Sequence, residues 1–134
     1  MSSTTLDAAT SSASPSLAWA GTAGRVLFAV PFVLFGLMHL AAPGDMAGMV
    51  PAWVPGGGTF WVLFTGVALA AAGVSLAIGR LVAWSGPLLA LLLLTFAATL
   101  HLPGAIGGDP MAITGFLKDL ALAGGALYLG IQAR

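Results

Sequence analysis

The chain has 134 residues, of which 59% are hydrophobic and only 6% are charged, and its mean hydropathy is +1.04. Soluble domains carry about 25% charged residues, so this composition cannot cover a water-facing surface and indicates an integral membrane protein. The formal net charge of zero gives no reason to expect nucleic acid as a partner, and the absence of cysteine excludes disulfides, thiolate metal sites and iron–sulfur clusters.

The N-terminal residues 1–22 are rich in Ser, Thr and Ala and contain no Lys or Arg. A cleaved secretory signal needs a positive start followed by a short apolar core. We therefore expect a disordered tail over residues 1–22, followed by one transmembrane domain over residues 23–134.

Four apolar stretches in this domain are long enough to cross a bilayer. They cover approximately residues 25–42, 59–79, 81–101 and 110–133. Asp109 followed by Pro110 is a typical helix start, with a capping carboxylate before a proline in the first turn. We therefore predict an all-α fold: an integral membrane four-helix bundle, with a short turn between the third and fourth spans.

The segment between the first two spans, residues 43–58, contains helix-breaking Pro and Gly but also several apolar side chains. Such a segment is expected at the membrane interface or folded back over the bundle, where Trp side chains act as anchors. The residues assigned to this interfacial region are Asp45, Pro51, Trp53, Pro55 and Trp61.

Three arginines predict the orientation of the bundle. Arg25 precedes the first span, Arg80 joins the second and third, and Arg134 ends the fourth. With four crossings all three fall on one side, and the loops on the other side contain no Lys or Arg. The positive-inside rule then places both termini and Arg80 in the cytoplasm, in a multi-pass protein of the cytoplasmic (inner) membrane.

The other ionisable groups gather toward the outer side. His39 ends the first span and His101 ends the third, while Lys118 and Asp119 lie roughly 12–14 Å into the fourth span from its outer end. A charged residue inside a membrane span is costly, and this makes it a functional-site hypothesis by default.

Helical spacing indicates which way this charged pair faces. Lys118 shares a helix face with Thr114, and Asp119 shares the adjacent face with Gly115. Small residues mark helix–helix contacts in membranes, so both Lys118 and Asp119 are expected to face the bundle interior. Together with the two histidines they predict an outward-facing polar pocket for ligand binding or proton relay, made of His39, His101, Lys118 and Asp119.

Several alternatives stay open for these four residues. Lys118 can snorkel outward and pair with an acid, while Asp119 accepts hydrogen bonds from a histidine in a purely structural role. A bis-histidine b-type haem is a lesser alternative, because such sites usually sit deeper between helices. A transition-metal site from His39, His101 and Asp119 has equally little support, since no spacing motif accompanies it. We assign no catalytic residue, no metal and no certain cofactor.

Short motifs add a family resemblance. The sequences GLMHL at Gly36–Leu40, MVPAWVP at Met49–Pro55, FWVLFTG at Phe60–Gly66 and the Gly-Arg hairpin at Arg80 resemble the DoxX-like family of small bacterial membrane proteins. The resemblance covers about residues 25–134 and implies a four-helix membrane bundle. It also implies a link to membrane redox complexes, including a thiosulfate:quinone oxidoreductase, or to thiol and oxidative-stress systems.

Two classes of function follow. The first is an accessory subunit of a quinone-linked or oxidative-stress redox system, in which the polar pocket binds a quinone head group or docks a membrane or periplasmic oxidoreductase. The second is binding or transport of a small solute or proton, and a purely structural partner in the lipid bilayer is a further alternative. An autonomous enzyme is less expected, because no nucleophile–base arrangement is visible. The sequence leaves an oligomer open.

Overall fold

The computed structural model describes residues 15–134, and within that range the protein is helical and contains no strand. Four helices are long and apolar enough to cross a membrane, which confirms the predicted all-α, four-span architecture. In chain order the elements are α1 (Pro15–Ala41), α2 (Pro43–Ala47), α3 (Gly58–Ile78), α4 (Val82–Phe96), the π-helical turn η1 (Ala97–His101), α5 (Leu102–Ile106) and α6 (Pro110–Gln132).

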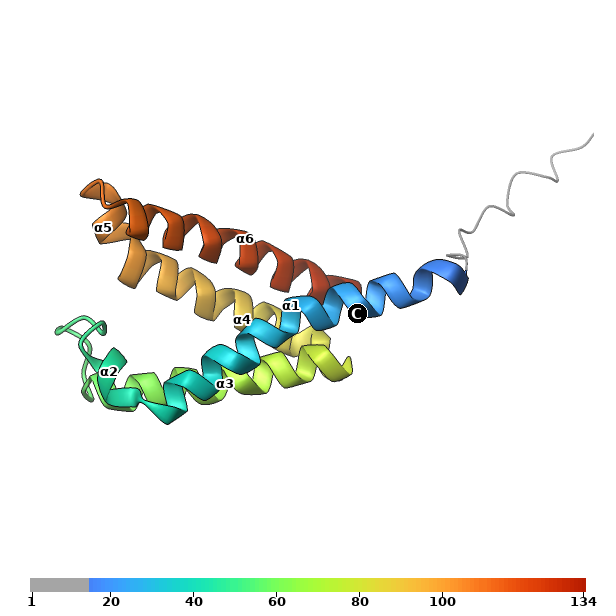
Figure 1. Ribbon diagram of the computed structural model, residues 1–134, viewed down its shortest axis with the longest axis horizontal. Helices are drawn as coiled ribbons and strands as arrows, with labels where there is room; N and C mark the ends of the chain where they lie inside the picture. Colours follow the sequence, from blue (N-terminus) through green and yellow to red (C-terminus); the bar gives the residue numbers. More distant parts are fainter. Residues whose placement is uncertain (1–14) are drawn as a thin grey trace, which may run out of the picture.

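The long helices form two antiparallel pairs, α1 with α3 and α4 with α6, joined by the tight turn between α3 and α4 (Figure 1). Small residues allow each pair to approach closely, as expected for helices in lipid. A Cβ atom added at Gly36 of α1 would lie 2.6 Å from the carbonyl oxygen of Gly66 in α3. A Cβ atom added at Gly86 of α4 would lie 2.6 Å from the carbonyl oxygen of Ala126 in α6. Larger residues would force both pairs apart.

A buried apolar cluster holds the two pairs together. Its members come from all four long helices and include Phe32, Leu69, Leu76, Leu89, Leu93, Ala123 and Ala126. The large apolar side chains on the outside, such as Leu88 and Leu91 of α4, are exposed and would face lipid. The bundle is therefore apolar on both its inside and its outside, which is the pattern of a helix bundle immersed in a bilayer.

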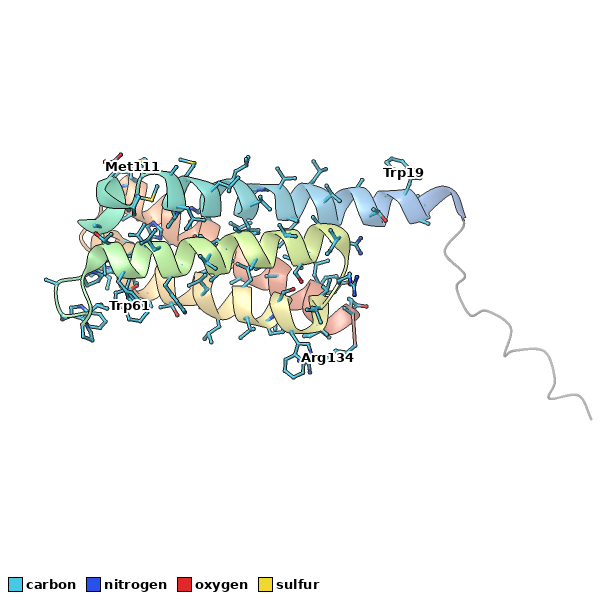
Figure 2. All side chains as sticks on the ribbon, turned by 90° about the horizontal axis from the view of Figure 1, so that it is seen from below. Trp19, Trp61, Met111 and Arg134 are labelled. Atoms are coloured by element: carbon cyan, nitrogen blue, oxygen red, sulfur yellow. The ribbon has the colours of Figure 1, made fainter. Side chains whose placement is uncertain are left out.

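The bundle has two unlike ends. One carries α2, the loop up to residue 57, and α5 with the turn that follows it; we call this the loop end. The other carries the turn at residues 79–81 and the C-terminal Arg134, and we call it the arginine end (Figure 2). The guanidinium of Arg25 also lies at the arginine end, since a Cβ atom added at Gly79 would sit 2.8 Å from one of its nitrogens.

Helix α1 begins earlier than the sequence suggested. The predicted tail over residues 1–22 is wrong from Pro15 onward, and residues 1–14 lie outside the described range. Pro15 suits the first position of a helix, and the alanines that follow favour helix once a helix is nucleated. Because Arg25 is level with the end of α3, the ten residues before it project roughly 15 Å beyond the bundle, with Trp19 exposed on them (Figures 1 and 2).

The third span also differs from its prediction. The turn expected after His101 is helical up to Ile106, because α4 continues through η1 into α5. Pro103 lies in the first turn of α5, directly after η1. Asp109 then caps α6 as predicted, with its Oδ1 accepting a hydrogen bond of 2.9 Å from the N–H of Met111.

The segment between α1 and α3 folds against the end of α3. The short helix α2 packs there, and the indole Nε1 of Trp61 donates a hydrogen bond of 2.6 Å to the carbonyl of Pro55. Gly57 precedes α3 with a φ of 82°, a conformation that favours glycine. Trp53 remains exposed at this end, as do Asp45 and Pro55, whereas Pro51 is half-buried.

Candidate functional site

The site is centred on His101, the last residue of the π-helical turn. The N–H of Leu102 donates to the carbonyl of Ala97, five residues earlier, so this turn is one residue wider than an α-helical turn. Such widened turns inside helices often occur at functional sites. Here the turn carries His101 toward α6, and the imidazole lies directly against Gly115, the only residue type without a Cβ to block it.

Asp119 of α6 forms a hydrogen bond with this histidine. Its side chain is buried, at 2% exposure, and its Oδ2 lies 2.8 Å from Nδ1 of His101, while its Oδ1 lies 3.6 Å from Nζ of Lys118. Each carboxylate oxygen therefore faces one basic group. A buried carboxylate without such partners would be strongly unfavourable, so this arrangement explains how α6 can carry Asp119 in its packed face.

The imidazole of His101 has one ring nitrogen occupied and one available. Nδ1 is engaged by Asp119, whereas Nε2 makes no hydrogen bond to any residue of the described chain, and 23% of the side chain is exposed. A carboxylate at Nδ1 fixes the orientation of the ring. Nε2 can then donate a hydrogen bond when the ring is protonated and accept one when it is neutral.

Lys118 lies at the edge of this site rather than inside it. The expectation that both members of the pair face the interior is right for Asp119 and wrong for Lys118, whose side chain is 50% exposed. Its ammonium lies 5.7 Å from the ring centroid of Phe35 on α1, within cation–π range. Residues 118 and 119 are about 100° apart around a helix, and here only the Asp119 side chain is buried.

His39 does not join the other three residues. Its Nδ1 lies 2.7 Å from the carbonyl oxygen of Phe35 one turn earlier, and its Cβ packs against Gly66 of α3. The four-residue pocket therefore reduces to His101, Lys118 and Asp119. Phe35 bridges the gap to His39, because its carbonyl contacts His39 while its ring faces Lys118.

The other acids of residues 15–134 stand apart from the site. Asp109 is committed to the cap of α6, and Asp45 is exposed in α2. Within residues 15–134 no group of three His, Asp, Glu or Cys side chains lies close enough together to hold a metal ion. The arrangement favours hydrogen bonding and proton exchange with a small polar group.

Two contributors to the site escaped sequence reasoning. The sequence marked Gly115 only as a small residue. Its contact with the His101 ring depends on the packing of η1 against α6. Phe35 gave no signal beyond apolarity. The four residues before His101 are Ala97, Ala98, Thr99 and Leu100, and this sequence contains no recognisable mark of a π-helical turn.

The fold and its lipid-facing surface define a multi-pass helical membrane protein with a small polar site toward its loop end. Residues 28–106 match the model of a family described as a domain of unknown function, DUF8561, and because this match spans more than half of the chain, the protein belongs to that family. The matched region includes His101 but ends before Asp119. No curated protein and no solved structure matches the chain.

Proposed function

We propose that this protein is an accessory membrane subunit of a quinone-linked redox system, and that it binds a quinone head group at His101. The observation that carries the proposal is the hydrogen-bonded pair of His101 and buried Asp119, which leaves Nε2 of the imidazole available. The likeness of the sequence motifs to the DoxX-like family supports the same class of function.

The chemistry of the pair suits a quinone because the oxygen of the ligand changes its hydrogen-bonding role. A quinone carbonyl needs a donor, which the protonated imidazole supplies through Nε2, and a quinol hydroxyl needs an acceptor, which the neutral imidazole supplies through the same atom. Lys118 adds a second donor at the edge of the site. The chain would bind and orient the ring and hold its proton, and a partner oxidoreductase would supply the electrons.

Quinone retention tests the proposal directly. The purified protein in mild detergent is equilibrated with a short-chain ubiquinone analogue, and the retained analogue is quantified by mass spectrometry after removal of free ligand. We expect His101→Leu to reduce retention at least about tenfold, since a donor lost from a buried site leaves its partner unpaired. His39→Leu is the matched control, because His39 lies outside the site, and should retain the wild-type amount. Equal retention by the two variants would overturn the proposal.

Binding or relay of a proton or small solute is the second candidate, and the same His101–Asp119 pair favours it. Transport across the whole bilayer has less support, because the described ionisable groups of the arginine-end half are Arg25, Arg80 and Arg134, which lie at its rim. If the purified protein retains no quinone, and proteoliposomes that contain it take up protons, this second candidate would be favoured over quinone binding.

We further propose that the protein spans the cytoplasmic membrane with both termini and Arg80 inside. The support is that Arg25, Arg80 and Arg134 occupy the same end of the bundle. The chain contains no cysteine, so single-cysteine variants can be labelled without further engineering. Cysteine at Gly48 in the loop end should react with an impermeant maleimide in intact cells, and cysteine at Leu81 should react only after lysis. The reverse pattern would refute the orientation.

A further inference from the structure

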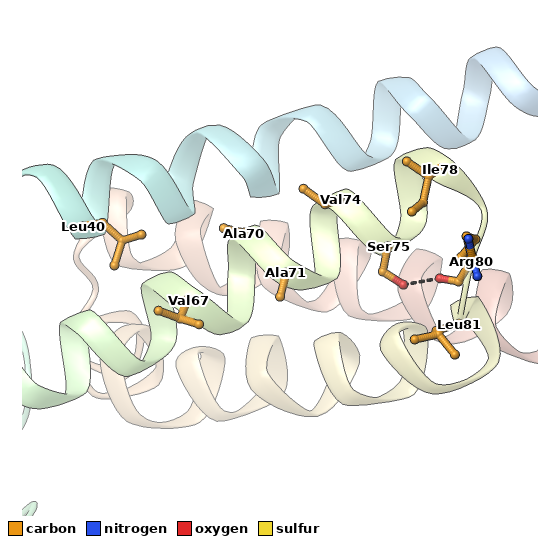
Figure 3. Close-up of a pocket in the computed structure, with 9 residues that line it drawn as sticks. All are labelled: Leu40, Val67, Ala70, Ala71, Val74, Ser75, Ile78, Arg80 and Leu81. Carbon is orange, nitrogen blue, oxygen red and sulfur yellow. Dashed lines mark hydrogen bonds between the residues drawn. The ribbon is translucent and has the colours of Figure 1, made fainter.

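A shallow apolar groove runs along the outer face of α3 toward the arginine end. Its volume is about 710 Å³, and it starts at Leu40 of α1 beside Val67 and ends at the α3–α4 turn (Figure 3). The lining residues are small or aliphatic except at that turn, and they are Leu40, Val67, Ala70, Ala71, Val74, Ser75, Ile78, Arg80 and Leu81. Only one end of the groove therefore carries a charge.

The length of the groove corresponds to one leaflet of a bilayer. From Val67 to Ile78 the helix rises roughly 16 Å, and half of a hydrocarbon core about 30 Å thick is about 15 Å. Val67 is also close to the middle of α3, which runs from Gly58 to Ile78. The apolar part of the groove thus extends from the middle of the membrane to its boundary, where Arg80 lies.

Within residues 15–134 no acidic side chain balances the charge at this boundary. Arg80 makes no ion pair with any residue of the described chain, and the guanidinium of Arg25 lies beside Gly79 in the same turn. Nε of Arg25 is buried and has no hydrogen-bond partner within residues 15–134. The acids of that range belong to the loop end or, for Asp119, to the His101 site. An anion from outside the protein would complement this cluster.

The backbone that carries Arg80 is held in place. Gly79 takes a left-handed conformation with a φ of 73°, and the N–H of Arg80 donates a hydrogen bond of 3.1 Å to the carbonyl of Ser75. The hydroxyl of Ser75 in turn hydrogen-bonds the carbonyl of Arg80 (Figure 3). The backbone from which the Arg80 side chain extends at the end of the groove is therefore held by the fold.

We infer that this groove is a binding site for an anionic phospholipid of the adjacent leaflet. One acyl chain lies along α3 between Val67 and Ile78, and the phosphate is bound by Arg80, with Arg25 adding positive charge. The guanidinium group matches a phosphate oxygen pair in a planar, bidentate fashion. The site is separate from the His101 pair, and the inference holds whichever leaflet faces the arginine end.

Native mass spectrometry of the full chain in detergent tests the inference, with phosphatidylglycerol and phosphatidylcholine of the same acyl chains as probes. The wild type should retain phosphatidylglycerol about five-fold more tightly than phosphatidylcholine, the effect expected of one well-placed cation. Arg80→Gln should abolish this preference. Arg134→Gln, which removes an arginine from the same end but outside the groove, should keep it.

A second pair of variants tests the acyl-chain groove. Ala71→Phe fills the groove and should weaken binding of both lipids, whereas Ala121→Phe places the same bulk on an exposed position of α6 and should have no effect. Equal losses for Arg80→Gln and Arg134→Gln would show a non-specific lipid annulus and overturn the inference. Competition by glycerol phosphate as strong as that by intact phosphatidylglycerol would also overturn the inference, because it would indicate a site for soluble anions.

Discussion

Replacing Gly115 by alanine tests whether the contact between α6 and the His101 ring holds the site together. The added Cβ would lie 2.5 Å from Cδ2 and 2.6 Å from Nε2 of His101, against 3.4 Å for an ordinary contact, so the ring must retreat by about 1 Å. A side-chain ring can normally rotate away from such a contact at little energetic cost. This ring cannot do so freely, because its Nδ1 is hydrogen-bonded to Asp119 at 2.8 Å. A 1 Å retreat would lengthen that bond beyond a useful hydrogen-bond distance.

The expected magnitude follows from two opposing terms. Alanine stabilises a helix relative to glycine by about 0.5–1 kcal/mol, whereas overpacking at a tight contact costs about 1–3 kcal/mol. Gly124→Ala on the same helix is the matched control, because nothing lies within 4 Å of its added Cβ. The free energy of unfolding of Gly115→Ala should therefore be lower than that of Gly124→Ala by about 1–3 kcal/mol.

The assay is reversible unfolding in mixed detergent, followed by tryptophan fluorescence, together with the quinone-retention measurement. A double-mutant cycle sharpens the interpretation: in an Asp119→Leu background the ring is free to turn, so the penalty of Gly115→Ala should shrink. Equal stability of the two glycine variants, or an unchanged penalty in that background, would refute the reasoning that the ring is locked between Gly115 and Asp119.

Three further predictions concern the frame around the site. Asp109→Ala should lower stability by about 1 kcal/mol through loss of the α6 cap, whereas Asp45→Ala should have no effect, as thermal melting would show. Trp61→Phe removes the hydrogen bond to Pro55 and should lower the free energy of unfolding by about 0.5–1.5 kcal/mol, again measured by thermal melting. Gly36→Leu should separate α1 from α3, and faster proteolysis in detergent would reveal it, while wild-type resistance would contradict the tight packing.

The sequence sufficed for the features that depend on one helix at a time. The number of spans followed from length and hydropathy, the start of α6 followed from Asp109 and Pro110, and the burial of Asp119 followed from its neighbours at helical spacing. Each of these depends on local periodicity, which a single sequence displays.

The features that sequence reasoning missed depend on contacts between helices. His39 and His101 end their spans on the same side of the membrane, yet His39 packs on Gly66 and His101 on Gly115, because α1 pairs with α3 while α4 pairs with α6. Depth in the membrane could be counted along the chain, but pairing could not. The π-helical turn was missed for a similar reason, since its hydrogen-bond shift has no simple sequence signature.

Whether the His101–Asp119 pair serves function or only structure can be decided by making Asp119 apolar. Removing one member of a buried ion pair is usually damaging because it leaves the other charge buried and unpaired. That penalty is small here, since Lys118 is half exposed and can extend to the interface, and His101 can stay neutral. The free energy of unfolding of Asp119→Leu should therefore lie within about 1–2 kcal/mol of the wild-type value, whereas its quinone retention should be lost.

Asp119→Asn separates charge from shape in the same experiment. The amide oxygen can still accept a hydrogen bond from Nδ1 of His101, so the ring keeps its place, but the negative charge beside it is removed. Retention should fall between that of the wild type and that of Asp119→Leu. If Asp119→Leu instead binds quinone like the wild type, the carboxylate only packs α6 against η1, and the site proposal fails even though the fold stands.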